Sequence, residues 1–157
     1  MKKIPLLAFL FLSVSIVAQK YYTKTGKTQF KASVEAFEPV EATNNSTTAI
    51  INTASGDIAS LLFVKAFNFR VALMQEHFNE NYMDASTFPK ATFKGTILDF
   101  DKITVLETIK AINGNLTMHG ITKEITIEAS IKKTSNAIKM TGDFFINLAD
   151  FGVEIPP

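Results

Sequence analysis

The sequence has no cysteine, no tryptophan and only two histidines, His77 and His119. Without cysteine there is no disulfide framework, no thiolate metal site and no cysteine nucleophile, and two histidines are too few for a multi-histidine zinc site. An excess of one charge is also missing, because 16 lysines and arginines stand against 15 aspartates and glutamates. Proteins that bind nucleic acids usually carry a basic excess. We therefore predict no bound metal and no nucleic-acid partner.

The common catalytic motifs are missing as well. The sequence has no Gly-x-Ser-x-Gly elbow, no His-Glu-x-x-His pair and no glycine-rich phosphate loop. The acidic residues between positions 76 and 84 lack the spacing of a calcium-binding loop and are typical of a solvated helix face. We predict a protein that is not an enzyme and needs no cofactor. A hydrolase or isomerase that acts on a bound lipid through His119 or His77 is the weakest alternative.

The first 18 residues have the layout of a secretory signal peptide. Lys2 and Lys3 precede an apolar run over residues 4–17, and Ala18 is a small residue at the expected cleavage point. At ~1.5 Å per residue the apolar run is shorter than the ~30 Å hydrocarbon core of a bilayer. We therefore predict cleavage, directly after Ala18 or one residue later, rather than a stable membrane anchor.

The mature chain is expected to form one domain, residues 19–157. Removing the two N-terminal lysines from the 16 basic residues leaves 14 against 15 acidic residues, a net charge of −1. A near-neutral, exported chain without disulfides is typical of the bacterial envelope. We predict that the protein is periplasmic or secreted.

Most of the mature chain alternates apolar and polar residues with the period of two that is typical of β-strands. The clearest example is residues 124–132, where Ile125, Ile127, Ala129 and Ile131 alternate with polar side chains. The pattern predicts strands over residues 29–36, 48–52, 57–67, 91–97, 112–118, 124–132 and 138–148.

One segment has helical spacing instead. Val71, Met74, Phe78 and Tyr82 recur at intervals of three and four residues, which predicts a helix over residues 71–83.

Turn-prone residues separate the predicted strands at 54–57, 113–114 and 119–123. The last of these turns contains Gly120, which favours a β-hairpin over residues 115–132.

One helix cannot cover the apolar face of a seven-stranded antiparallel sheet. The sheet must therefore curl into a barrel or form two packed layers. A barrel of about eight strands is either filled by its own side chains or holds one small ligand. The 14 phenylalanines supply an apolar interior in both cases, and the alternation does not distinguish a full interior from a hollow one.

Three stretches carry a resemblance to a known family. They are LMQEHFNENYM at 73–83 followed by FPKATFKG at 88–95, then GNLTMHGITK at 114–123, then FFINLADFGVEIP at 144–156. In this order and spacing they resemble the YceI-like family of exported lipid- and polyisoprenoid-binding proteins. The resemblance implies an all-β fold, a lipocalin-like extended antiparallel β-barrel with one α-helix near one end, that holds a long lipid chain.

The resemblance also implies a final strand after Pro156, whereas this sequence stops at Pro157. We therefore expect a barrel that lacks its closing strand and has an open edge, which invites pairing with another chain. A homodimer that shares strands, a truncated product and an incomplete sequence would each account for the difference.

The leading hypothesis is an exported protein that sequesters or carries a long-chain isoprenoid, quinone or fatty-acid-type lipid. The alternative is a structural or adhesion β-module with a solid core that binds protein or glycan through its loops. If the interior is hollow, the predicted apolar lining consists of Phe30, Val34, Phe63, Phe78, Phe93, Ile97, Leu116, Met118, Ile127, Phe144 and Ile146. If the interior is full, the same residues form the core.

Three polar residues are candidates for the mouth of the barrel, namely His77, His119 and Lys123. Each could contact a lipid head group. Each also has a simpler interpretation: His119 forms hydrogen bonds within its turn, His77 anchors the helix end, and Lys123 lies on the wet face of the sheet.

Overall fold

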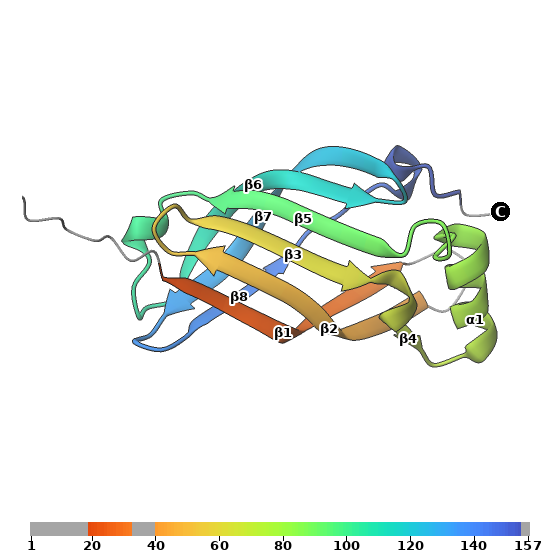
Figure 1. The fold of residues 1–157 in the computed structure, drawn as a ribbon, viewed down its shortest axis with the longest axis horizontal. Coiled ribbons are helices and arrows are strands. Elements are labelled where there is room, and N and C mark those ends of the chain that lie inside the picture. The colour runs from red at the N-terminus through yellow and green to blue at the C-terminus, as the bar shows by residue number, and fades with distance from the viewer. Residues whose placement is uncertain (1–18, 33–39, 155–157) are drawn as a thin grey trace, which may run out of the picture.

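The strands form one antiparallel sheet that curls around an elongated interior, with α1 at one end (Figure 1). The computed structural model describes residues 19–32 and 40–154. Neighbouring strands follow the order β1-β2-β3-β5-β6-β7-β8, and the short β4 pairs with β2. The strands are β1 (Lys20–Ala32), β2 (Val40–Asn52), β3 (Asp57–Phe63), β4 (Asn68–Phe69), β5 (Lys90–Ile97), β6 (Thr108–Met118), β7 (Ile121–Lys133) and β8 (Ile138–Asp143). The helical elements are η1 (Val64–Ala66), α1 (Ala72–His77), the π-helical η2 (Phe78–Tyr82), η3 (Phe100–Lys102) and η4 (Leu148–Phe151).

The sheet confirms the predicted all-β barrel. In β7 the side chains of Ala129 and Ile131 are buried while Glu124 and Glu128 are exposed, as the alternation predicts. The strands wrap into a nearly closed barrel, and in the described residues no pairing joins its two edge strands, β1 and β8. The predicted signal peptide, residues 1–18, and Val34 lie outside the described residues.

The N-terminal strands are longer than the predicted segments 29–36 and 48–52. β1 and β2 pair from Lys20 opposite Asn52 onward, and the register shifts on both sides of Gly26. Such bulges shift the side-chain parity, so a period of two over the whole strand cannot be read from the sequence.

Two predicted strands end earlier than expected. β3 stops at Phe63 because residues 64–66 form a helical turn, closed by a hydrogen bond from the Phe67 N–H to the Val64 carbonyl at 3.2 Å. β8 stops at Asp143, and the chain then reaches η4 without regular structure.

The predicted turn at residues 113–114 is wrong, because both residues lie in the middle of β6. Gly114 is paired with Gly95 of β5. A Cβ atom on Gly114 would lie 2.7 Å from Cζ of Phe93 and 2.6 Å from Cα of Gly95. Glycine is needed here because the Phe93 ring and a neighbouring backbone approach closely, not because the chain turns.

The predicted hairpin over residues 115–132 is confirmed. Met118 pairs with Ile121, and the two intervening residues have positive φ, 51° at His119 and 75° at Gly120. Positive φ at both central positions is the type I′ geometry, whose twist matches the flanking strands.

The predicted helix over residues 71–83 corresponds to α1 and η2 together, which span residues 72–82. Phe78 and Tyr82 pack against the core, as the spacing predicts. Among the helices in the described ranges, none has the length and apolar character needed to span a membrane.

Candidate functional site

Strand register identifies the inner face of the barrel. Ile51, Ile58, Gly95, Gly114 and Ile125 are paired in succession across five strands, so they share one face of the sheet. Ile51 and Ile58 are buried, which makes this face the inner one.

The barrel is densely packed at the end opposite α1. Ile97, Ile112 and Ile131 are almost completely buried there, and Phe100 and Ile103 of the η3 segment cover them. Side chains packed to this extent leave no room for a ligand chain. These fully buried side chains are therefore core, whereas the half-buried side chains at the same level of the barrel lie on β7 and β8.

The end of the barrel next to α1 holds a cluster of four phenylalanine rings. Phe30 of β1 lies 5.6 Å from Phe78 of η2, centroid to centroid, and Phe69 of β4 lies 4.9 Å from Phe78. Phe67 contacts both Phe30 and Phe78 edge-on. Phe67 is buried, but the other three rings are only half-buried, so apolar aromatic surface faces accessible space.

Half-buried apolar side chains continue along the open side of the barrel. β8 pairs only with residues 128–133 of β7, so the preceding part of β7 has no strand on that side among the described residues. The side chains there and on β8 pack against the core on one side and are accessible on the other. We name Ile125, Ile127, Ile138, Met140 and Ile146 the apolar track.

A hollow lies at the end of the apolar track. Its volume is about 600 Å³, and Ile146, Leu148 and Val153 supply its apolar lining. All the residues that line it belong to the segment that follows β8.

Four residues of the predicted lining lie buried on the inner face: Phe93, Ile97, Leu116 and Met118. Phe30 and Phe78 belong to the aromatic cluster, and Ile127 and Ile146 belong to the apolar track.

Two residues of the predicted lining lie elsewhere. Phe63 is 48% exposed on the outer face, and the Lys90 ammonium lies 5.4 Å from its ring centroid. The lining prediction is wrong for Phe63. Side chains of a strand alternate between the two faces, and Phe63 lies an odd number of residues after the inward-pointing Ile58 of the same strand, so it points outward. Phe144 is 44% exposed and follows the end of β8, so strand alternation no longer sets its direction.

His119 lies within a structural contact rather than at an open mouth. Its Nδ1 donates a hydrogen bond to the Phe151 carbonyl at 3.0 Å, and its ring lies 4.6 Å from that of Phe88. His77 is the half-buried last residue of α1. Lys123 is exposed and pairs with the buried Leu116, so it lies on the inner-face side of β7.

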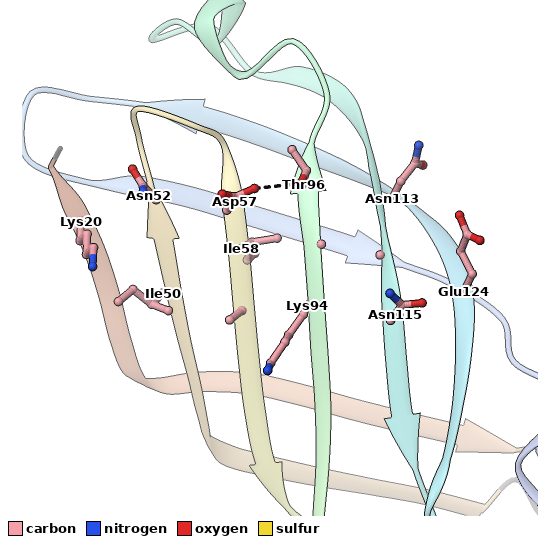
Figure 2. A pocket seen from close by; sticks show the side chains of 13 residues that line it. Lys20, Ile50, Asn52, Asp57, Ile58, Lys94, Thr96, Asn113, Asn115 and Glu124 are labelled. Carbon is pink, nitrogen blue, oxygen red and sulfur yellow. Dashed lines mark hydrogen bonds between the residues drawn. The ribbon is translucent and has the colours of Figure 1, made fainter.

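A polar trough crosses the outer face of the sheet (Figure 2). Its volume is about 630 Å³, and Lys94, Asn115 and Glu124 lie along it. Asp57 accepts hydrogen bonds from Ser55 Oγ at 2.7 Å and Thr96 Oγ1 at 2.9 Å, which lower the pKa of its carboxyl group. Because these side chains point outward, the trough is separate from the apolar interior.

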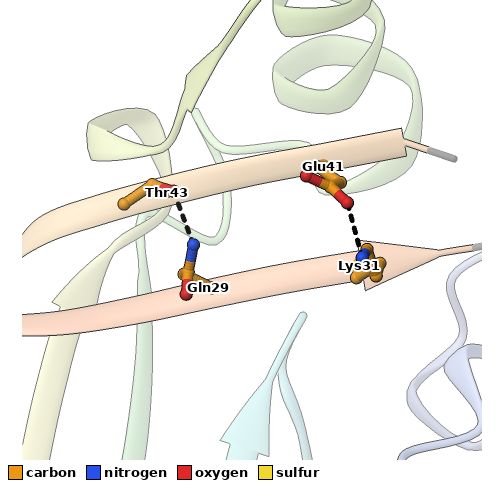
Figure 3. Close-up of polar contacts among 4 residues, drawn as sticks. All are labelled: Gln29, Lys31, Glu41 and Thr43. Atoms are coloured by element: carbon orange, nitrogen blue, oxygen red, sulfur yellow. Dashed lines mark hydrogen bonds and ion pairs between the residues drawn. The ribbon is translucent and has the colours of Figure 1, made fainter.

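The outer face of β1 and β2 is polar at the end next to α1 (Figure 3). The Lys31 ammonium lies 2.7 Å from the Glu41 carboxylate, and Gln29 donates a hydrogen bond to Thr43 Oγ1 at 3.4 Å. The hydrogen bond from Lys31 and its charge lower the pKa of Glu41. These cross-strand pairs favour the register that turns Phe30 inward.

No group of three or more histidine, aspartate or glutamate side chains in the described part of the chain is arranged to hold a metal ion.

A family model described as YceI-like domain matches residues 13–156. The chain belongs to the YceI-like family. No curated protein matches its sequence.

Three solved structures share the YceI-like fold. A polyisoprenoid binding domain from Saccharophagus degradans, implicated in plant cell wall breakdown, aligns with a TM-score of 0.74 at 14% identity over 88% of this chain and 83% of that one. Burkholderia cenocepacia BcnA aligns with a TM-score of 0.68 at 18% identity over 83% of each chain. A Campylobacter jejuni YCEI protein aligns with a TM-score of 0.55 at 15% identity over 98% of this chain and 85% of that one.

The three stretches that resemble the YceI-like family meet in space at His119. Phe88 comes from the first stretch, His119 from the second and Phe151 from the third, and the two contacts of His119 join them. The hydrogen bond from His119 to the Phe151 carbonyl holds the β6–β7 turn against the C-terminal segment.

Several residues of the accessible interior are absent from the predicted lining. Ile125 and Ile138 show the correct alternation in the sequence, but alternation does not reveal which apolar positions stay accessible. Phe69 is accessible in the two-residue β4, which is too short for a periodic signal. The neighbouring Phe67 is buried and follows η1, at a point where the predicted strand 57–67 has already ended.

Proposed function

We propose that this YceI-like protein binds one long-chain lipid of the isoprenoid, quinone or fatty-acid type along its inner face. The observation that supports the proposal is the apolar track together with the half-buried aromatic cluster. Both present apolar side chains that the chain itself leaves partly accessible. Such surface marks a ligand site more often than an ordinary core.

Burial of apolar surface is the mechanism of binding. Each methylene group removed from water contributes ~0.8 kcal/mol, so a long chain binds well without specific polar contacts. Selection among tails is therefore loose. The binding of a polyisoprenoid by the domain from Saccharophagus degradans supports an isoprenoid chain as the first ligand to test.

We propose binding rather than catalysis. His119 is engaged with the Phe151 carbonyl, and His77 stands at the end of α1 without a nucleophile among its hydrogen-bond partners in the described residues.

We also propose export to the periplasm or the medium, directed by residues 1–18. A mass of the purified protein that matches a chain cleaved after residue 18 or 19 would support export. A mass that matches the uncleaved chain would contradict it.

The test of lipid binding is mass spectrometry of an organic extract from protein purified without detergent. We expect one lipid species at about one molecule per protein. An empty extract from folded protein that also fails to bind added isoprenoid alcohols would favour the alternative, a β-module with a solid core.

We also propose that two copies form a homodimer by pairing through β1 and β8, the edge strands of the described sheet. Sedimentation of the same sample tests whether the protein is a dimer.

A further inference from the structure

The loop between β5 and β6 exposes apolar side chains at the end of the barrel opposite α1 (Figure 1). Three residues of this loop and of the start of β6 are strongly exposed, Val105 by 68%, Leu106 by 73% and Ile109 by 72%. We name these three residues the apolar tip. Single apolar side chains are ordinary on a protein surface, but three within five residues form a patch of the kind that marks a protein or membrane contact.

The fold holds the apolar tip in place without burying it. Phe100 and Ile103, at the base of the same loop, are buried in the core. The Thr104 carbonyl accepts a hydrogen bond from the Lys133 N–H at 2.8 Å, and Thr104 Oγ1 accepts one from the Leu106 N–H at 3.2 Å. The apolar tip is therefore a fixed feature of the surface, and its side chains contribute little to the stability of the barrel.

Lysines lie beside the apolar tip. The hydrogen bond from Lys133 places the β7–β8 turn next to the loop. Residues 129–142, which include this turn, contain three lysines and no acidic residue: Lys132, Lys133 and Lys139. Lys132 and Lys139 are paired directly across β7 and β8, where like charges repel. None of the three forms an ion pair with a carboxylate of the described residues. The turn therefore favours contact with an anionic partner.

The two ends of the barrel differ in charge. The loop and the turn together, residues 98–110 and 129–142, contain five lysines against three acidic residues, a net charge of +2. At the other end Leu73 is 59% exposed on α1, but residues 71–84 contain three acidic residues and no lysine or arginine. Anionic lipid attracts lysines and repels carboxylates. The apolar tip thus lies at the end whose charge is complementary to an anionic membrane surface.

We propose that the apolar tip docks on an anionic lipid bilayer, with Val105 and Leu106 among the head groups and the lysines of the β7–β8 turn against lipid phosphates. An apolar face flanked by lysines is typical of proteins that bind the membrane interface. The inference rests on the proposed lipid binding, because a long apolar chain is taken from a membrane rather than from water. The apolar track reaches this end, since Ile138 is paired with Lys133. The lipid chain therefore passes between the bilayer and the track at the docked end.

The absence of tryptophan from the sequence makes this docking measurable by fluorescence. Leu106→Trp places a single tryptophan on the apolar tip, and Leu73→Trp places one at an exposed position of α1 as the matched control. Each mature variant is mixed with vesicles of phosphatidylcholine, or of phosphatidylcholine and phosphatidylglycerol in equal parts. Lipids with brominated acyl chains report whether the tryptophan enters the bilayer.

We expect anionic vesicles to shift the emission of Leu106→Trp to shorter wavelengths and brominated chains to quench it, while Leu73→Trp stays unchanged. Sedimentation of the wild type with anionic vesicles should weaken at high salt, because salt screens the lysines. Lys132→Gln/Lys139→Gln should lower the partition coefficient about ten- to thirtyfold. Val105→Ser/Leu106→Ser should lower it at least about tenfold without lowering the unfolding temperature, because both side chains are exposed.

Three results would overturn the inference. A spectral shift of Leu73→Trp in place of Leu106→Trp would assign the docking to the α1 end. Equal binding to neutral and anionic vesicles, or binding to neither, would show that the protein does not recognise anionic lipid. A wild-type dimer that dissociates in Val105→Ser/Leu106→Ser, with no binding to vesicles, would assign the apolar tip to a second copy of the chain.

Binding of geranylgeraniol without vesicles is measured in parallel to separate this inference from the proposed function. A protein that binds geranylgeraniol but no vesicles would keep the proposed function and refute the docking. A protein that binds anionic vesicles through the apolar tip but no geranylgeraniol would support the docking and contradict the proposed function.

Discussion

Tryptophan substitutions at two inner-face positions should have opposite effects on ligand affinity and on stability. Ile127 lies on the half-buried apolar track, where added volume extends into accessible space. Phe93 is only 7% exposed, and its Cζ lies 2.9 Å from the position of a Cβ on Gly95 and 2.7 Å from one on Gly114. A larger ring fits at the first position and not at the second.

The magnitudes follow from the two environments. An indole at position 127 fills space that about three methylene groups of the ligand would occupy, so the loss is about 2.4 kcal/mol, or about sixty-fold in Kd. Ile127→Trp should leave the unfolding temperature nearly unchanged. Phe93→Trp overpacks the core by about 1–3 kcal/mol, which lowers the unfolding temperature by roughly 2–4 °C for each kcal/mol.

The assay is displacement of a fluorescent fatty-acid probe, with thermal unfolding measured on the same samples. Ile109→Trp is the control, because Ile109 is 72% exposed on the outer face and should change neither quantity. Unchanged affinity in Ile127→Trp, or a loss of affinity that matches a loss of stability, would refute the assignment of the apolar track as the ligand surface.

Three further substitutions test other parts of the structure. Gly114→Ala should lower the free energy of unfolding by about 1–3 kcal/mol in urea titrations, because the new Cβ has no room beside Phe93; an unchanged midpoint would contradict the close approach. Thr96→Val removes a donor to the Asp57 carboxylate and should raise the pKa of Asp57 toward its ordinary value of 3.8 in an NMR titration. Since the folded-state pKa of Asp57 is lowered, its carboxylate stabilises the native protein above the ordinary pKa, and this stabilisation is lost as the pH falls through the folded-state pKa. The stabilisation should be smaller in Thr96→Val. An identical Asp57 titration curve in both proteins would contradict the hydrogen bond from Thr96. His119→Ala should speed amide exchange in η4 while β1 stays protected, and equal exchange in both proteins would show that the hydrogen bond to the C-terminal segment contributes nothing.

The periodic parts of the fold could be predicted from the sequence. β7 alternates without interruption, and the helical spacing of Phe78 and Tyr82 places both side chains against the core. The start of β1 could not be predicted, because the register shifts around Gly26 break the alternation. A glycine within a strand and a glycine within a turn also have the same sequence signal, which explains the error at Gly114.

The candidate site was predictable only in part. Alternation assigns Ile127 to the inner face, but the accessibility of that face depends on where β8 ends, and no local pattern marks that point. Phe63 follows the same apolar run as Ile58, yet its parity places it outside.

Isoleucine methyl NMR tests the central claim most directly. Methyl spectra of the mature protein are compared before and after addition of geranylgeraniol. We expect chemical-shift changes at the track residues Ile125, Ile127, Ile138 and Ile146, and unchanged signals from the outer-face residues Ile50 and Ile109. Changes confined to the outer face, or no changes at saturating lipid, would contradict the account that the open inner face of the barrel holds a lipid chain.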